Sequence, residues 1–69
     1  MAKFRYIGPH QPRVDGTYEF RVKSKKFSVT FRPNEVFDIP DTVDPFVLKC
    51  IRGHIDYFTK QKDYQEVLP

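Results

Sequence analysis

Two runs of strictly alternating side chains, residues 18–22 and 27–31, constrain the fold of this chain most. In each run apolar and polar residues take turns, so an extended backbone would have one apolar face and one polar face. Four polar residues, Lys23-Ser24-Lys25-Lys26, separate the two runs. Alternating runs joined by a short polar segment are typical of a half-buried β-hairpin, and we predict one here.

Further short apolar runs predict the other strands of the fold. They are residues 4–7, closed by Gly8-Pro9, residues 35–39, closed by Pro40, and residues 64–68 near the end of the chain. The second of these runs, residues 35–39, places Phe37 and Ile39 on the core side and Asp38 in water. Pro33-Asn34 is expected to make the turn that precedes it.

Asp44 and Pro45 predict the start of a two-turn helix over residues 45–52. Proline suits the first helical position and disfavours a helical conformation in the residue before it, which favours Asp44 over Asp41 as the cap. Gly53 then predicts a left-handed stop. The apolar side chains of this helix share one broad arc, which we expect to pack on the sheet: Phe46, Val47, Leu48, Cys50 and Ile51.

The elements together predict one mainly β (β-rich α+β) domain over residues 1–69. About five short strands and one short helix fit a small SH3-like or OB-like barrel, or a curved antiparallel sheet. A chain of 69 residues supports one marginal core, and its single cysteine, Cys50, excludes an intramolecular disulfide. We therefore expect burial against a partner to add to its stability.

Charge is divided unevenly along the chain. Residues 1–32 hold eight basic and two acidic residues, a formal charge of +6, whereas residues 33–69 hold four basic and seven acidic residues, a formal charge of −3. This asymmetry fits nucleic-acid contact, and it equally fits head-to-tail packing of identical or neighbouring subunits in an assembly.

Groups that could carry chemistry are few. Cys50 and His54 have helix-like spacing, but Cys50 lies on the apolar arc and Gly53 interrupts the helix between them. Adding His10 gives three soft ligands at most, fewer than a closed zinc site needs. The acidic string does not match a calcium loop and is better explained by turns and caps: Asp38, Asp41 and Asp44. We predict no enzymatic activity, metal, cofactor or small-molecule substrate.

The first seven residues contain no apolar run of the length that a signal peptide or membrane span requires. We therefore expect no export signal, no transmembrane segment and no membrane partner, and a lone cysteine fits synthesis in a reducing compartment.

The basic hairpin is the best candidate for nucleic-acid binding. Its cations could hold phosphates: Arg21, Lys23, Lys25, Lys26 and Arg32. The aromatic residues of the two strands share faces with Val22 and Val29, however, and are predicted to lie in the core and not beside the cations. A solvated loop that keeps a strand edge from pairing with other chains explains the lysines better than phosphate binding does. Nucleic-acid binding is therefore the second hypothesis.

Protein neighbours are the first hypothesis. Terminal strands with apolar residues can add to a neighbour's sheet, and exposed tyrosines are favoured where one end of a side chain is buried and the other is wet. The candidate interface residues are Phe4, Tyr6, Ile7, Arg21, Lys23, Lys25, Lys26, Tyr57, Tyr64, Val67 and Leu68.

Four short motifs appear in a suggestive order: Arg5-Tyr6-Ile7-Gly8, Phe31-Arg32-Pro33-Asn34-Glu35, Val36-Phe37-Asp38-Ile39-Pro40-Asp41, and Asp63-Tyr64-Gln65-Glu66-Val67. In this order the chain resembles the small accessory structural proteins of tailed bacteriophages, which are encoded by short reading frames among the head and tail genes. It departs from their pattern at Pro33-Asn34, where glycine is usual, and in its longer basic hairpin.

The resemblance implies a virion component: a capsid cement or decoration protein, or a part of the neck, tail or baseplate. Its partners would be other virion proteins or copies of itself, and it would be made in the host cytoplasm. A small nucleic-acid-binding β-barrel that uses the basic hairpin is the alternative.

Overall fold

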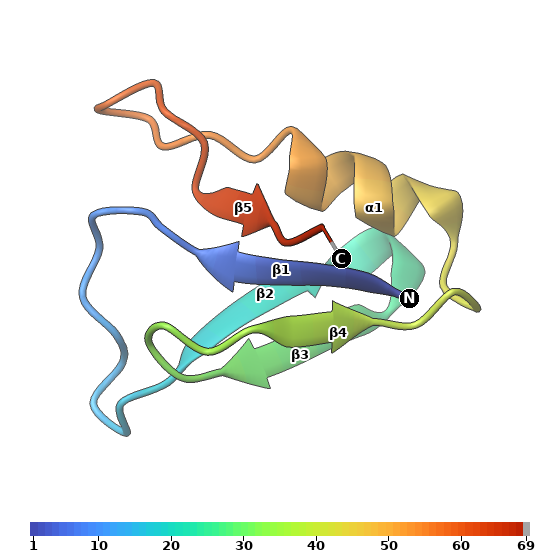
Figure 1. The fold of residues 1–69 in the computed structure, drawn as a ribbon, viewed down its shortest axis with the longest axis horizontal. Helices are drawn as coiled ribbons and strands as arrows, with labels where there is room; N and C mark the ends of the chain where they lie inside the picture. The colour runs from blue at the N-terminus through green and yellow to red at the C-terminus, as the bar shows by residue number, and fades with distance from the viewer. Residues whose placement is uncertain (69) are drawn as a thin grey trace.

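The computed structural model describes residues 1–68, which form five strands, one α-helix and one 3-10 turn (Figure 1). In chain order these elements are β1 (Ala2–Tyr6), β2 (Tyr18–Val22), η1 (Lys23–Lys25), β3 (Phe27–Phe31), β4 (Phe37–Ile39), α1 (Pro45–Arg52) and β5 (Tyr64–Glu66). The predicted mainly β fold of five short strands with one short helix is confirmed, and the helix has the predicted bounds. Within the described residues, no helix has the length and apolar character that crossing a bilayer requires.

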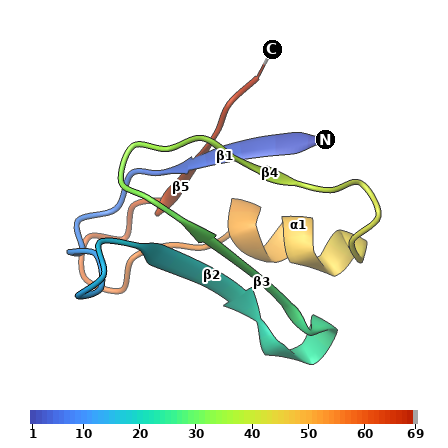
Figure 2. The same cartoon turned by 90° about the horizontal axis from the view of Figure 1, so that it is seen from below.

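The strands form two antiparallel sheets. One has the order β4-β1-β5, with Phe4 opposite both Phe37 and Glu66, and the other is the predicted hairpin of β2 and β3, in which Tyr18 lies opposite Phe31. Figure 2 shows the sheets as two layers with α1 beside the space between them. Of the shapes that the sequence predicts, a closed barrel is not formed by residues 1–68, because β2 and β3 pair with each other and not with the other sheet.

The position of β1 corrects one expectation. Residues 4–7 were expected to offer a free edge to a neighbour's sheet, but β1 is the central strand and is paired on both sides. Phe4 therefore points into the core, where it is 1% exposed, and it is not an interface residue. A short strand with one apolar face looks the same in sequence whether it lies at an edge or in the centre.

The core lies between the two sheets and is rich in aromatic rings. The Phe31 and Phe37 rings stack with centroids 4.1 Å apart, and the Tyr64 ring meets both edge-on. Such pairs join the hairpin to the three-stranded sheet, because Phe31 comes from β3 and Phe37 from β4. The buried core residues are Phe4, Phe20, Val22, Phe31, Phe37, Ile39, Val47, Ile51 and Tyr64.

The helix begins as the sequence predicts and ends differently. Asp44 accepts a hydrogen bond from the backbone N–H of Phe46 at 2.8 Å, and Pro45 occupies the first helical position. Gly53 was predicted to be a left-handed stop, but its φ is −98°. Its N–H still donates to the carbonyl of Lys49 at 3.1 Å, so the last turn is satisfied without a left-handed residue.

Candidate functional site

Asp56 organises the loop of residues 54–63, which connects α1 to β5. Asp56 is 3% exposed, and its Oδ2 accepts hydrogen bonds from the backbone N–H groups of Phe58 at 2.9 Å and Thr59 at 2.8 Å. These donors, Thr59 foremost, hold the pKa of Asp56 below its usual value. The loop is therefore a fixed turn built on one carboxylate.

The same turn presents two large aromatic side chains to solvent. Tyr57 is 76% exposed and Phe58 is 80% exposed, and their rings meet edge-on with centroids 5.3 Å apart. The ammonium of Lys60 lies 4.5 Å from the centroid of the Tyr57 ring, within cation–π range. Single exposed apolar residues are ordinary, but two adjacent rings on a fixed turn, with exposed Ile55 beside them, form a patch of the kind that binds proteins.

His10 fastens the 54–63 loop to the N-terminal half of the chain. Its Nε2 pairs with Oδ1 of Asp56, the carboxylate oxygen that the amides of the turn do not use. The backbone of His10 is itself held at two points: its N–H donates to the Tyr6 hydroxyl at 3.3 Å, and its carbonyl accepts from the Tyr18 hydroxyl at 2.7 Å. The turn thus has a defined place against β1 and β2 as well as a defined shape.

A second histidine–aspartate pair closes the other end of the loop. Nδ1 of His54 lies 2.8 Å from Oδ2 of Asp63, and the backbone N–H of Asp63 donates to the carbonyl of His54 at 3.0 Å. The remaining carboxylate oxygen, Oδ1, is buried and has no hydrogen-bond partner within residues 1–68. It lies under Gly8, where an added Cβ would stand 2.5 Å from it and would also overlap the Tyr6 hydroxyl.

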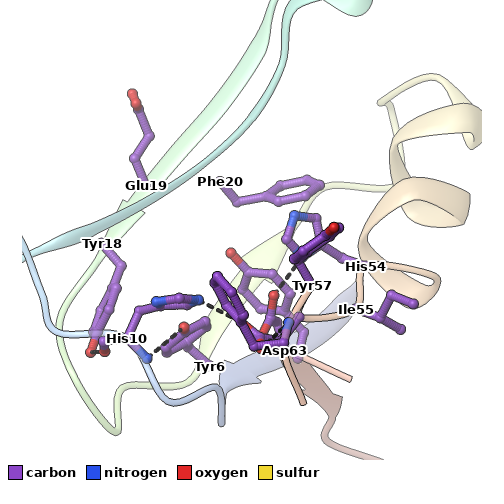
Figure 3. Close-up of a pocket in the computed structure, with 12 residues that line it drawn as sticks. Tyr6, His10, Tyr18, Glu19, Phe20, His54, Ile55, Tyr57 and Asp63 are labelled. Atoms are coloured by element: carbon purple, nitrogen blue, oxygen red, sulfur yellow. Dashed lines mark hydrogen bonds and ion pairs between the residues drawn. The ribbon is translucent and has the colours of Figure 1, made fainter. Parts of the chain in front are cut away.

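These groups surround a hollow of about 470 Å³ between β2 and the 54–63 loop, which we call the aromatic pocket (Figure 3). Figure 3 shows aromatic rings, imidazoles and Asp63 arranged around it. Its walls combine six aromatic rings with three carboxylates and two imidazoles: Tyr6, His10, Tyr18, Glu19, Phe20, His54, Ile55, Asp56, Tyr57, Phe58, Asp63 and Tyr64. The volume is in the range of small binding pockets.

The pocket walls combine apolar ring faces with acidic groups. Burial raises the pKa of Tyr6 and of Tyr64, so both rings stay neutral and keep their hydroxyl protons. The arrangement can hold an apolar or cationic group between rings and carboxylates.

Cys50 and His54 do not meet as a nucleophile and base. His54 is engaged by Asp63, while Cys50 is a half-buried residue of α1 outside the pocket lining. In the described part of the chain, no three histidine, cysteine, aspartate or glutamate residues gather in a way that could hold a metal ion.

The candidate interface residues of the C-terminal half are divided by the structure. Tyr57 and Leu68 are exposed and Val67 is half-buried. Tyr64 is 7% exposed, so its placement in an interface is wrong. The reason is that its ring fills the space between Phe20, Phe31 and Phe37, which the alternation of a three-residue strand cannot reveal.

The candidate interface residues of the N-terminal strand also differ in their exposure. Ile7 is exposed, and Tyr6 is half-buried with its ring 4.5 Å from that of Tyr18 in the wall of the aromatic pocket. Tyr6 therefore contributes to a site, but as a pocket wall and not as a free strand edge.

The basic hairpin is exposed as predicted, but its cations differ in their surroundings. Arg21 pairs with Glu19 at 3.2 Å, and Lys25 pairs with Asp44 at 3.2 Å. Lys23 and Lys26 have no ion-pair partner within residues 1–68.

A fixed turn holds those two lysines. η1 covers Lys23, the backbone N–H of Lys26 donates to the carbonyl of Lys23 at 3.1 Å, and Lys26 takes a left-handed conformation with φ 52°. We call residues 23–26 the hairpin tip.

Sequence reasoning missed the parts of the site that hold it together. Asp56, Asp63 and Phe58 were not proposed as site residues, and His10 was considered as a metal ligand alone. The aspartate alone is a weak signal for the bonds from Phe58 and Thr59, because an aspartate side chain can accept from the backbone two and three residues on. The His10–Asp56 pair spans 46 positions and has no local signal.

Comparisons with known proteins add no relative to this picture. No protein-family model, no curated protein and no solved structure matches the chain.

Proposed function

We propose that this chain is a non-enzymatic binding protein, a structural or accessory component of a tailed-phage particle that binds neighbouring virion proteins. The observation that carries the binding function is the exposed pair Tyr57 and Phe58 on a turn fixed by Asp56. Tyrosine and other aromatic side chains are enriched at interface centres, and a turn that is already fixed loses little entropy when it binds. The virion as the place of action follows from the motif order described above.

Mass spectrometry of purified particles tests the proposal, using a phage whose genome encodes this chain. We expect the chain in the particle in fixed proportion to a major head or tail protein. Its absence from particles that carry all other structural proteins would refute a virion role.

Attachment to the particle gives a residue-level test. A Tyr57→Ala, Phe58→Ala double variant should fold but attach weakly or not at all. Val14→Ala is the matched control, because Val14 is a fully exposed apolar residue in a different loop. Equal attachment of the double variant and the control would contradict a role for the 54–63 loop.

Nucleic-acid binding is the second candidate, and one observation supports it. Arg21, Lys23 and Lys26 surround a shallow cup of about 270 Å³ that also includes the half-buried Phe27. A gel shift with single- and double-stranded DNA would show a complex that weakens steeply with salt and is lost in Lys23→Glu, Lys26→Glu. Binding that persists in this variant would remove the hairpin from consideration.

A further inference from the structure

The aromatic pocket has the chemistry of a site for a cation. Aromatic faces attract an ammonium or guanidinium group, and the pocket adds the carboxylates of Asp56 and Asp63 behind its rings. Glu19, the third carboxylate, is paired with Arg13 at 3.8 Å and Arg21 at 3.2 Å and contributes less. No lysine or arginine stands among the described residues of the lining.

Asp63 gives an independent indication of the same preference. Its side chain is 5% exposed, it lines the pocket, and its Oδ1 has no hydrogen-bond partner within residues 1–68. A buried carboxylate oxygen without a donor is costly, and a positive charge brought into the adjacent pocket lowers that cost. His54 pairs with the other oxygen of Asp63, and His10 pairs with one oxygen of Asp56.

The chain itself carries a complementary group. Lys23 and Lys26 are exposed, held by a fixed turn, and without an ion pair in the described chain, whereas Lys25 is committed to Asp44 and lies 5.7 Å from the Phe46 ring centroid. The hairpin tip therefore projects two uncommitted ammonium groups.

The hairpin tip and the 54–63 loop lie at opposite ends of the molecule, as both views of the fold show (Figures 1 and 2). A chain therefore cannot place Lys23 or Lys26 in its own pocket. A second copy can, because each copy carries both halves of the contact.

We infer that copies of this chain associate head to tail, with a lysine of one hairpin tip, Lys23 or Lys26, inserted into the aromatic pocket of the next copy. The inference rests on the proposed binding function and names a second copy as the partner at the pocket. Such a contact is heterologous: it forms a ring if the rotation between copies closes and an open filament if it does not. The hairpin tip belongs to the basic first half of the chain, whereas the 54–63 loop belongs to the acidic second half.

Light scattering and sedimentation of the full chain test the inference first. The average mass should rise with protein concentration at about 0.1 M salt and fall toward the monomer near 1 M salt, where the Debye length shrinks from about 10 Å to roughly 3 Å. A chain that remains monomeric at all concentrations at the lower salt overturns the inference.

Two variants provide the sharper test, because each damages only one side of the contact, either the hairpin tip or the aromatic pocket. Lys23→Glu, Lys26→Glu removes the hairpin lysines and keeps the pocket, whereas Tyr57→Lys places a cation at the pocket rim on a side chain that is 76% exposed. Each variant alone should associate at least roughly tenfold more weakly than the unaltered chain. Mixed, they should form a one-to-one dimer and nothing larger, because one intact hairpin tip and one intact pocket remain.

The control for charge is Arg32→Glu, Lys49→Glu, which makes the same change in net charge as the lysine variant at exposed positions outside the hairpin tip and the pocket lining. This variant should associate like the unaltered chain. The inference is overturned if the control associates as weakly as the lysine variant. It is also overturned if the mixture of the hairpin-tip variant and the pocket variant forms no dimer.

These outcomes are separable from failure of the proposed function. A monomeric chain that still attaches to particles through Tyr57 and Phe58 overturns head-to-tail association and leaves the binding function in place. A chain that self-associates but is absent from particles refutes the virion role and leaves head-to-tail association in place. A hairpin whose lysines bind DNA while the chain stays monomeric also overturns the inference.

Discussion

The imidazole of His10 is paired with the carboxylate of Asp56 across 46 positions of the chain. One oxygen of Asp56 faces His10, and the other accepts from the backbone of Phe58 and Thr59. A single buried carboxylate thus fixes the shape of the 54–63 loop and its position against the N-terminal half. The exposed aromatic pair of that loop depends on this arrangement.

Replacing Asp56 should therefore loosen the turn before it affects the core. In Asp56→Ala the amide protons of Phe58 and Thr59 lose their acceptor, and we expect them to exchange with solvent markedly faster while the amides of β2 and β3 keep their protection. Hydrogen exchange followed by NMR measures this directly. The control is Asp41→Ala, at an exposed carboxylate, which should change the exchange of neither set of amides. Unaltered exchange at Phe58 and Thr59 in Asp56→Ala would show that the turn does not need the carboxylate.

Acid should weaken the fold through the same residue. The pKa of Asp56 is lowered from the usual 3.8, mainly by the Thr59 N–H, so the folded state favours the ionised form. Its contribution to stability is complete above the unfolded pKa and is lost as the pH falls through the folded pKa.

Thermal unfolding of the unaltered chain and Asp56→Asn, compared from pH 6 to about pH 2, measures this contribution. The unaltered chain should be the more stable at pH 6, and the difference should shrink below about pH 4. The pKa is also lowered for the carboxyl groups of Asp15, Asp44 and Glu66. These groups contribute equally in both proteins, so their effects cancel in the comparison. A difference that stays constant with pH would contradict this role for Asp56.

Elements whose cause is local could be predicted from the sequence. The alternation of residues 18–22 and 27–31 gives the β2–β3 hairpin, because one apolar face per strand suffices to define it. The Asp44-Pro45 pair gives the start of α1, because the cap bond from Phe46 and the fixed φ of proline act within three residues.

Features whose cause is distant could not be predicted. Tyr64 is buried because Phe20, Phe31 and Phe37 come from three other strands to enclose it, and a three-residue strand carries too little pattern to show this. The aromatic pocket has the same origin, since its walls come from β1, the loop that contains His10, β2, the 54–63 loop and β5. The individual residues were visible in the sequence, but their meeting is a property of the fold.

A side chain at Gly8 should lower the stability of the fold. A Cβ there would stand 2.5 Å from Asp63 Oδ1 and overlap the Tyr6 hydroxyl, so Gly8→Ala must shift two groups of the pocket wall. We expect a loss of about 1–3 kcal/mol in the free energy of unfolding, measured by urea denaturation. Gly53→Ala is the control, because its Cβ would come no closer than 3.3 Å to the Lys49 carbonyl. An equal effect of the two changes would argue against close packing over Asp63.

The core should respond to small losses of volume at Ile51, which is fully buried on α1. Ile51→Val should lower the free energy of unfolding by about 1 kcal/mol and Ile51→Ala by about 2–5 kcal/mol, the second being a large part of the stability of a small domain. Urea denaturation measures both, and the exposed Val36, replaced by alanine, provides the control. A cost at Ile51 no greater than at Val36 would mean that α1 does not seal the core.

The aromatic pair of the 54–63 loop should matter for binding and not for folding. Tyr57 and Phe58 are 76% and 80% exposed, and the bonds that fix their turn use the backbone N–H of Phe58, which alanine retains. Tyr57→Ala, Phe58→Ala should therefore change the free energy of unfolding by no more than about 0.5 kcal/mol for each residue, measured by urea denaturation beside Val14→Ala. A larger loss would show that the two rings stabilise the folded chain. Their exposure would then not be evidence for a binding partner.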